Sequence, residues 1–368
     1  MKILFVLHEL TRTGSPMVML NFLRWLKKYT PHKIMVVALK TGELQSDFES
    51  VVDNLILQPP SERNNFKTRF KNKLLLKDSP RLVFNKQLLK LRPDLIYANS
   101  VPTFSLAIKI KQNTNVRLIA HLHEARTMLE LIDKSWINYY HLIDQFIVPS
   151  QLVLSDLQDL IKTKDINVNV VRETPVSEIK PKLSTNSNFI VGGSGTVHWR
   201  KGPELFIQVA IQFFKRNPVA PVKFQWIGHI DKVFKIIYTH DIEKAGLEGK
   251  IEFLGSIKNP IDFYEDFSVF LMTSREDPYP LVCVENGLLG NPIISFEGAT
   301  GINETIADGG GIIVPYLDTV AMAEAVETCF ENRDLLIEMG EKAQNLFKTS
   351  DFDIVFPALN DIINLDVN

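Results

Sequence analysis

The sequence predicts an α/β protein built from two Rossmann-like domains. Three observations support this class: apolar strand patterns alternate with helical patterns in the first half of the chain, the alternation is repeated in the second half, and the charge changes sign between the halves. A chain of 368 residues has room for two domains of ordinary size. The composition, with 45% hydrophobic and 23% charged residues, is typical of globular proteins and argues against disorder or a coiled coil.

The expected elements follow one another in a regular order. Residues 2–7 (KILFVL) predict a buried first strand, since the apolar run is too short for the core of a signal peptide. Helices are predicted at 16–29, at about 203–216 and at 352–365, where apolar residues recur at helical spacing. Further strands are predicted at 33–39, 95–98, 118–121, 145–148, 188–195, 223–228, 251–255, 267–272 and 292–296. Strands separated by helices indicate parallel sheets.

The domain boundaries are set by residues 173–187 (ETPVSEIKPKLSTNS), which combine two prolines with little apolar content and no period. We interpret this segment as a linker. The sequence then predicts an N-terminal domain at 1–172 and a C-terminal domain at 188–350. Residues 351–368 are expected to form a helix that packs back on the N-terminal domain.

The two halves carry opposite charge. Residues 1–172 hold 25 lysines and arginines against 15 acids, a net of +10, whereas residues 173–368 hold 16 against 28, a net of −12. A basic domain favours anionic partners such as phosphorylated substrates, acidic glycans or a negative membrane surface. Alternatively, the opposite charges attract the two domains to each other.

The most basic segment is 63–92, with ten lysines and arginines, one acid and interleaved phenylalanines and leucines. This pattern predicts contact with a membrane surface. The alternative is a solvated helix pair whose lysine stems cover apolar neighbours. No nucleic-acid recognition motif accompanies the charge, so we expect no nucleic-acid partner.

The expected location is the cytoplasm. The two cysteines, Cys283 and Cys329, have neither a disulfide framework nor metal-site spacing and fit a reducing compartment. No run approaches the roughly 18 apolar residues of a membrane span. We therefore predict a cytoplasmic protein, with peripheral attachment to the inner membrane face through 63–92.

A glycine-rich loop follows the strand at 188–195. Its glycines do not match the dinucleotide fingerprint, because His198 stands where the last glycine is required. Arg200 and Lys201 precede a helix that opens at Pro203. Two cations beside a helix N-terminus and a glycine turn predict a diphosphate site. A tight turn with surface charges is the structural alternative.

A second constellation lies after the strand that ends near Met272. Asp277 precedes a helix, and Glu285 lies about one turn inside it. Both carboxylates could project beyond the carboxyl end of the strand, where open α/β sheets bind ligands, and accept hydrogen bonds from sugar or ribose hydroxyls. Alternatively, either acid is favoured near a helix start by the helix dipole.

Two further motifs belong to the first half. Gly14 and Ser15 form the first turn between strand and helix. His121 and His123 are spaced to point to one side of a strand and could bind a metal, but no third ligand is evident nearby. A polar histidine at a strand end is more often a hydrogen-bonding partner of a substrate.

Together these motifs resemble glycosyltransferase family 4 (GT4), whose members are retaining, use nucleotide sugars, and have the GT-B fold of two Rossmann-like domains facing each other across a crevice. The resemblance covers nearly the whole chain and is strongest at 188–315. The stretch from Asp277 to Glu285 matches the family's E-x7-E element with aspartate in first place. The remaining matches are Gly14–Pro16, His123–Glu124, Lys201–Gly202, Gly290–Ile294, Gly301–Glu304 and Gly309–Pro315.

The sequence departs from the family at two donor-site positions. Thr196 stands where the family usually has an arginine that helps to bind the diphosphate, and Arg200 is the candidate substitute. The carboxylate of Asp277 is one methylene shorter than the family's glutamate.

The resemblance implies a role for each matching residue. Lys201, assisted by Arg200, neutralises the donor diphosphate, and Glu285 holds the ribose hydroxyls. Asp277 and His123 contact the donor sugar. Gly14 and Ser15 approach the phosphates, and Gly255 and Ser256 lie near the base. Main-chain N–H groups come from Tyr279, Leu281 and Val282. No cofactor and no metal are expected; the one Asp-x-Asp triplet, at 351–353, lies outside this pattern.

The predicted function is transfer of a sugar from a nucleotide sugar to a hydroxyl of a glycan or lipid-linked glycan, in cell-surface polysaccharide assembly. The alternative is a catalytically weak GT-B subunit that binds glycans or joins a complex, which the changes at Thr196 and Asp277 would fit. Sugar-nucleotide epimerisation ranks third. The base, sugar, acceptor, linkage and oligomeric state are not specified by the sequence.

Overall fold

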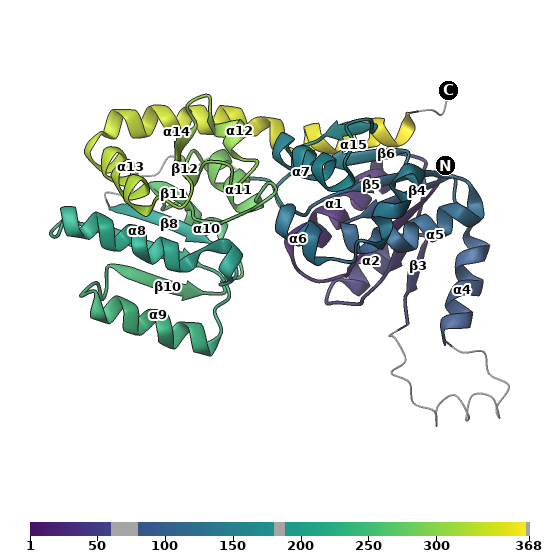
Figure 1. Cartoon of the computed structure of the whole chain (residues 1–368), viewed down its shortest axis with the longest axis horizontal. Coiled ribbons are helices and arrows are strands. Elements are labelled where there is room, and N and C mark those ends of the chain that lie inside the picture. The colour runs from purple at the N-terminus through teal and green to yellow at the C-terminus, as the bar shows by residue number, and fades with distance from the viewer. Residues whose placement is uncertain (60–79, 180–187, 366–368) are drawn as a thin grey trace. The chain divides into compact units, whose positions relative to one another are not determined.

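The computed structural model describes residues 1–59, 80–179 and 188–365, and the chain divides into two compact units (Figure 1). Unit 1 comprises residues 1–148, residues 157–171 and the C-terminal residues from 356 onward. Unit 2 comprises residues 149–156 and 172–355. Each unit contains its own parallel sheet with flanking helices, as predicted for Rossmann-like domains.

Unit 1 contains a seven-stranded sheet in the order β3-β2-β1-β4-β5-β6-β7. The strands are β1 (Lys2–Leu7), β2 (Lys33–Ala38), β3 (Asn54–Leu57), β4 (Leu95–Asn99), β5 (Arg117–His121), β6 (Gln145–Val148) and β7 (Val168–Val170). The helices are α1 (Gly14–Tyr29), α2 (Gln45–Val51), α4 (Pro80–Leu91), α5 (Phe104–Thr114), α6 (Arg126–Leu131) and the 3-10 segments η1 (Val101–Thr103) and η2 (Ser135–Leu142). The central strands are buried on both faces, which explains their continuous apolar runs.

The C-terminal helix α15 (Phe352–Asn364) forms where the apolar pattern predicts a helix. The ring centroid of Phe356 in α15 lies 5.4 Å from that of Phe22 in α1. The guanidinium of Arg117 donates hydrogen bonds to three carbonyl oxygens at the end of this helix, which would otherwise lack donors. These carbonyls belong to Ile362, Ile363 and Leu365.

Unit 2 contains a six-stranded sheet in the order β10-β9-β8-β11-β12-β13. The strands are β8 (Phe189–Ser194), β9 (Val222–Ile227), β10 (Ile251–Gly255), β11 (Val269–Met272), β12 (Ile293–Phe296) and β13 (Gly311–Val314). The helices are α8 (Pro203–Arg216), α9 (Lys232–Lys244), α10 (Ile261–Tyr264), α11 (Leu281–Leu289), α12 (Asn303–Ile306), α13 (Thr319–Glu331), α14 (Arg333–Phe347), and the 3-10 segments η3 (Trp199–Lys201) and η4 (Lys348–Ser350). Helix α7 (Gln151–Ile161) begins in unit 2 and ends in unit 1.

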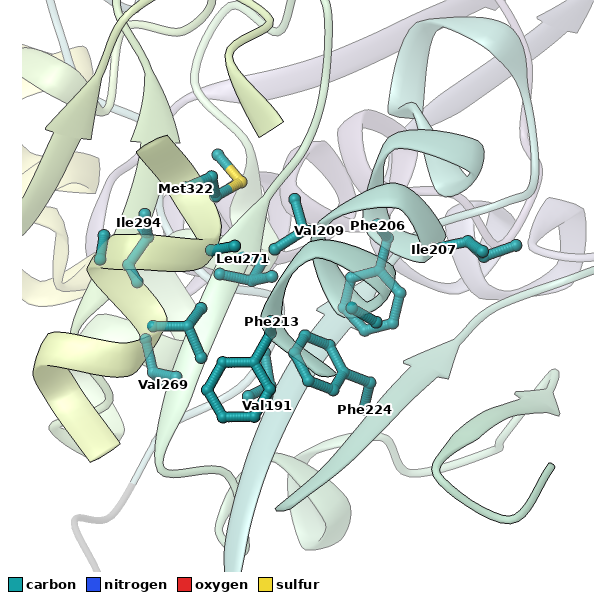
Figure 2. Close-up of a cluster of buried hydrophobic side chains, with 14 of the residues drawn as sticks. Val191, Phe206, Ile207, Val209, Phe213, Phe224, Val269, Leu271, Ile294 and Met322 are labelled. Atoms are coloured by element: carbon teal, nitrogen blue, oxygen red, sulfur yellow. The ribbon is translucent and has the colours of Figure 1, made fainter. Parts of the chain in front are cut away.

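Two apolar clusters cover the two faces of the unit 2 sheet. One cluster joins α8 and α13 to the strands; Figure 2 shows the phenyl rings of α8 beside Phe224 of β9. The ring centroids of Phe206 and Phe213 lie 5.6 and 5.8 Å from that of Phe224. The other cluster contains apolar residues of α10, α11, α12 and α14. Alternate residues of β11 enter alternate clusters, which fixes the face to which each strand residue points.

The structure differs from the sequence prediction in several details. Strands β3 and β7 are absent from the predicted elements, because they are short and only partly buried. Residues 149–156 belong to unit 2 rather than to the predicted domain 1–172. Hydrogen bonds to Glu304 of unit 2 attach this segment to that unit. The Glu304 carboxylate accepts from the backbone N–H groups of Gln151 and Leu152 at 3.1 and 2.9 Å.

Two predicted segments fall partly outside the described residues. They are residues 180–187 of the expected linker and residues 63–79 of the basic segment. Within the described part of the chain, no helix combines the length and the apolar character that a membrane crossing requires.

Candidate functional site

Each sheet reverses its strand order at one place, and most of the predicted site residues follow the strands that flank this place. The reversal lies between β1 and β4 in unit 1 and between β8 and β11 in unit 2. Such topological switch points leave room for ligands beyond the carboxyl ends of the strands.

In unit 2, the loop after β8 is tied to the neighbouring strand β9. The N–H of Gly195 donates to the Ile227 carbonyl at 2.9 Å, and the indole N–H of Trp226 donates to the Gly195 carbonyl at 2.9 Å. Gly228 packs directly on Gly195, because a Cβ at Gly228 would lie 2.0 Å from the Gly195 carbonyl oxygen. The loop can therefore follow this path only with glycine at position 228.

The same loop is fixed to the end of β11 immediately after Lys201. Gly202 adopts φ +63° between η3 and α8, and a Cβ there would lie 2.2 Å from the Thr273 carbonyl oxygen. The hydroxyl of Thr273 donates to the Lys201 carbonyl at 3.1 Å. The backbone of Lys201 and Gly202 thus lies directly against Thr273, the residue that follows β11.

Replacing Gly202 by alanine is expected to destabilise the fold by at least about 2 kcal/mol, because the methyl group meets backbone and the residue is strained. Gly249→Ala is the matched control, since Gly249 has φ +74° but open space around its Cα. It should lose only about 1 kcal/mol. Urea unfolding of both variants tests this, and equal losses would contradict the close contact with Thr273.

The two loop cations converge on Asp277. The ammonium of Lys201 lies 2.6 Å, and a guanidinium nitrogen of Arg200 3.0 Å, from the same carboxylate oxygen. Arg200 also donates to the Glu276 carbonyl at 3.1 Å. Burial alone would raise the pKa of Asp277, but the charges of Lys201 and Arg200 hold this pKa below its ordinary value of 3.8. The carboxylate is therefore ionised at neutral pH.

Glu285 has the opposite environment. It lies in the second turn of α11, is 8% exposed, and makes no hydrogen bond or ion pair with any described residue. Burial raises the pKa of Glu285 from 4.5 to about 8. The thiol of Cys283 experiences the charges of Asp277, Lys201 and Glu285, which places the three groups in one neighbourhood. A buried carboxyl group without a partner is suited to hydroxyl groups of a ligand.

Glu285 is expected to make stability depend on pH. Below about pH 4.5 the carboxyl is protonated in both states, so it has no effect. Between about pH 4.5 and 8 the unfolded state loses this proton and the folded state retains it, so the free energy of unfolding falls as pH rises. The total loss is on the order of 5 kcal/mol. Urea unfolding of wild type and Glu285→Gln across this range measures the difference, and parallel curves would contradict the buried carboxyl.

The other predicted donor residues of unit 2 lie around the same edge of the sheet. α11 begins at Leu281, so Leu281 and Val282 supply first-turn N–H groups that have no acceptor within their own helix. The hydroxyl of Tyr279 bonds to Thr305 at 2.8 Å, so the side chain of this residue is part of the interior, and the predicted role of its main-chain N–H stays a prediction. Thr196 is exposed at the loop after β8, and Gly255 and exposed Ser256 stand at the end of β10.

In unit 1, Asn99 joins two residues that the sequence singled out. Its amide nitrogen donates to the Ser15 hydroxyl at 3.1 Å, and its amide oxygen lies 2.8 Å from Nε2 of His123. Gly14 opens helix α1 beside Ser15. Asn99 is not among the residues predicted from the sequence, because the apolar pattern of β4 ends at Ala98. The signal that could have identified it is an amide at the carboxyl end of a buried strand.

The two histidines have different surroundings. His121 is buried, its Nδ1 lies 2.7 Å from the Tyr97 hydroxyl, and burial, with a smaller contribution from His123, holds its pKa well below 6.5. His123 lies past the end of β5, and its backbone N–H donates to the Glu124 carboxylate at 3.0 Å. His121 is thus a neutral interior residue, and His123 is the histidine placed at the switch point.

Comparison with solved structures identifies the fold. Anabaena Alr3699/HepE, in complex with UDP and glucose, is 17% identical and matches with a TM-score of 0.78 over 99% of both chains. Sucrose-phosphate synthase (tll1590) from Thermosynechococcus elongatus is 15% identical, with a TM-score of 0.78 over 99% of this chain and 98% of that one. The chain has the GT-B fold.

Comparison of sequences identifies the family. Residues 188–332 match the model of "Glycosyl transferases group 1", and residues 12–172 match that of "Glycosyltransferase Family 4". Together the two matches span most of the chain. The chain belongs to the glycosyltransferases of family 4, which confirms the resemblance inferred from the motifs.

Curated relatives match over shorter stretches. A D-inositol 3-phosphate glycosyltransferase of Paenarthrobacter aurescens is 25% identical over 41% of this chain and 37% of its own length. The capsular polysaccharide biosynthesis glycosyltransferase CapM of Staphylococcus aureus is 26% identical over 49% of this chain and 47% of its own. The lipopolysaccharide core biosynthesis mannosyltransferase LpsB of Rhizobium meliloti is 28% identical over 44% and 46%. The chain matches less than half the length of each.

Proposed function

We propose that the protein is a retaining glycosyltransferase that moves a sugar from a nucleoside diphosphate sugar to a hydroxyl of a glycan or lipid-linked glycan acceptor. One observation carries this proposal. At the unit 2 switch point, the cations of Lys201 and Arg200 occur together with the buried carboxyl group of Glu285, which has no partner among the described residues. Cations suit a diphosphate, and an unpaired carboxyl suits the hydroxyls of a ribose.

The donor would be held by unit 2. Lys201 and Arg200 bind the diphosphate and offset the negative charge that grows on it as the bond to the sugar breaks. Glu285 accepts hydrogen bonds from the ribose hydroxyls. The first-turn N–H groups of Leu281 and Val282 assist at the N-terminus of α11. Thr196, Gly255 and Ser256 lie along the same edge of the sheet, where the nucleoside would extend.

For unit 1, the family resemblance implies a contact of His123 with the donor sugar and of Ser15, with Gly14, with the donor phosphates. Asn99 holds both side chains in place through its amide. The reaction proceeds without a metal or a cofactor, because the leaving-group charge is met by side-chain cations and helix N–H groups.

Polysaccharide assembly is the process that we propose. The relatives from Staphylococcus aureus and Rhizobium meliloti are named for capsular polysaccharide and lipopolysaccharide core biosynthesis. Anabaena HepE was solved with UDP and with UDP-glucose, which makes UDP-sugars the first donors to test.

A peripheral membrane contact at the cytoplasmic face is part of the proposal. Helix α4 carries Arg81, Lys86 and Lys90 without an acid, and Leu82 and Val83 are 43% and 42% exposed. Cations beside exposed aliphatic side chains suit an anionic lipid surface. Salt-sensitive binding to anionic vesicles, and none to neutral ones, is the expected behaviour.

The function is tested by incubating the protein in EDTA with a panel of nucleotide sugars and with glycan and prenyl-diphosphate-linked glycan acceptors. We expect one donor to be consumed, and nuclear magnetic resonance to show the donor's anomeric configuration in the product. An inverted configuration would contradict the retaining mechanism. Binding of a donor that is never consumed with any acceptor would instead favour a glycan-binding or complex-forming subunit.

A further inference from the structure

Asp277 neutralises the two cations that the proposed donor needs. Both the Lys201 ammonium, at 2.6 Å, and the Arg200 guanidinium, at 3.0 Å, contact the same oxygen, and the Ser274 hydroxyl lies 3.4 Å from it. The Asp277 side chain is 8% exposed, whereas those of Lys201 and Arg200 are 17% and 26% exposed. The cations are thus accessible to an anion from solvent while the carboxylate is covered.

The backbone of Asp277 is held as firmly as its side chain. Its N–H donates to the Ala299 carbonyl at 2.8 Å, and the residue forms an isolated bridge with Thr300. A short aspartate side chain on a fixed backbone keeps its carboxylate at the cations. This arrangement differs from the contact with the donor sugar that the family resemblance implies for this position.

Nearby acids do not change this balance of charge. Glu204 is paired with Arg275 at 2.5 Å, and Glu285, with a pKa of about 8, is largely protonated at pH 7. Among the described residues, Lys201 and Arg200 therefore form ion pairs with one carboxylate, that of Asp277. An entering diphosphate gains two cations but must compete with the carboxylate that already occupies them.

We propose that Asp277 is an internal counter-anion of the donor site: the donor diphosphate competes with it for Lys201 and Arg200, and it recaptures both cations when the nucleoside diphosphate product leaves. This inference rests on the proposed function for the identity of the natural anion. It makes Asp277 a positioning residue that weakens product binding.

The test is calorimetric titration, in EDTA, of inorganic pyrophosphate and of UDP, GDP, ADP, dTDP and CDP into wild type and Asp277→Asn. Asparagine keeps the size of the side chain and removes its charge. We expect Asp277→Asn to bind pyrophosphate and one nucleoside diphosphate about tenfold more tightly, since a nearby like charge is removed. The nucleoside diphosphate should also dissociate more slowly.

Three control variants locate the effect. The gain should disappear when Lys201→Met is combined with Asp277→Asn, and it should not occur in Asp262→Asn, which removes an exposed acid of the same unit. Asp277→Ser, also uncharged, should reproduce the gain and serves if the asparagine variant does not fold. Circular dichroism confirms the fold of each variant.

Several outcomes would overturn the inference. Unchanged pyrophosphate and nucleoside diphosphate affinity with weaker binding of the intact nucleotide sugar would assign Asp277 to the donor sugar. Weaker binding of all probes would make it a purely structural anchor. Absence of binding by any probe would show that the two cations form no anion site.

The proposed function can fail separately. Tighter pyrophosphate binding by Asp277→Asn in a protein that consumes no nucleotide sugar would support the counter-anion and contradict the proposed function. Sugar transfer by wild type together with weaker diphosphate binding by Asp277→Asn would support the proposed function and contradict the counter-anion.

Discussion

Lys201→Ala is expected to reduce sugar transfer at least about 100-fold while leaving the protein folded. The ammonium of Lys201 is one of two cations at the unit 2 switch point, and in the proposed reaction it offsets charge that develops on the leaving diphosphate. An interaction that strengthens in the transition state affects kcat as well as binding. Initial rates of nucleoside diphosphate release, measured over a range of donor concentrations, test this.

The fold of this variant is expected to survive, because Lys201 is partly exposed and Asp277 keeps its contact with Arg200. Lys215→Ala is the matched control, since Lys215 is an exposed lysine near the end of the adjacent helix α8. It should transfer sugar at the wild-type rate. Full activity in Lys201→Ala would remove this residue from the donor site.

Glu285→Gln is expected to have opposite effects on activity and stability. We expect kcat/KM for the donor to fall about 10- to 100-fold above about pH 8, where Glu285 is ionised, because a carboxylate forms stronger hydrogen bonds with ribose hydroxyls than an amide does. At pH 8 the same variant should unfold at a higher urea concentration than wild type, because the buried carboxyl group disfavours the folded state there.

Glu248→Gln provides the control for this pair of measurements, because Glu248 is an exposed acid of the same unit. Neither its activity nor its stability should change by a measurable amount. A stabilised Glu285→Gln with unreduced kcat/KM would show that the buried carboxyl is no ligand contact. A loss of both activity and stability would show that Glu285 is a structural residue.

Much of this arrangement could be predicted from the sequence, because strand patterns and loop motifs report local chemistry. Apolar runs identified β1 and β8, and the residues after them, Gly14 and Gly195, proved to lie at the two switch points. Gly202 and Gly290 belong to the motifs that match the family, and both adopt positive φ.

The contacts across the sheet could not be predicted in the same way. Asn99 meets His123 across 24 positions, and Lys201 meets Asp277 across 76. Such pairs depend on which strands become neighbours, and an apolar pattern does not contain that information. The shift of the Glu285 pKa depends on what buries it, so the residue type and its spacing indicated a carboxylate but not its protonation state.

Ligand-dependent stabilisation tests the central claim, that unit 2 binds a nucleoside diphosphate through Lys201. Thermal unfolding is recorded in EDTA for wild type and Lys201→Ala with UDP, GDP, ADP, dTDP or CDP. A ligand at about 100 times its dissociation constant adds about 2.7 kcal/mol to the stability of the folded state. We predict that one diphosphate raises the unfolding temperature of wild type and leaves Lys201→Ala unchanged. A folded wild-type protein that none of the five stabilises would contradict the account.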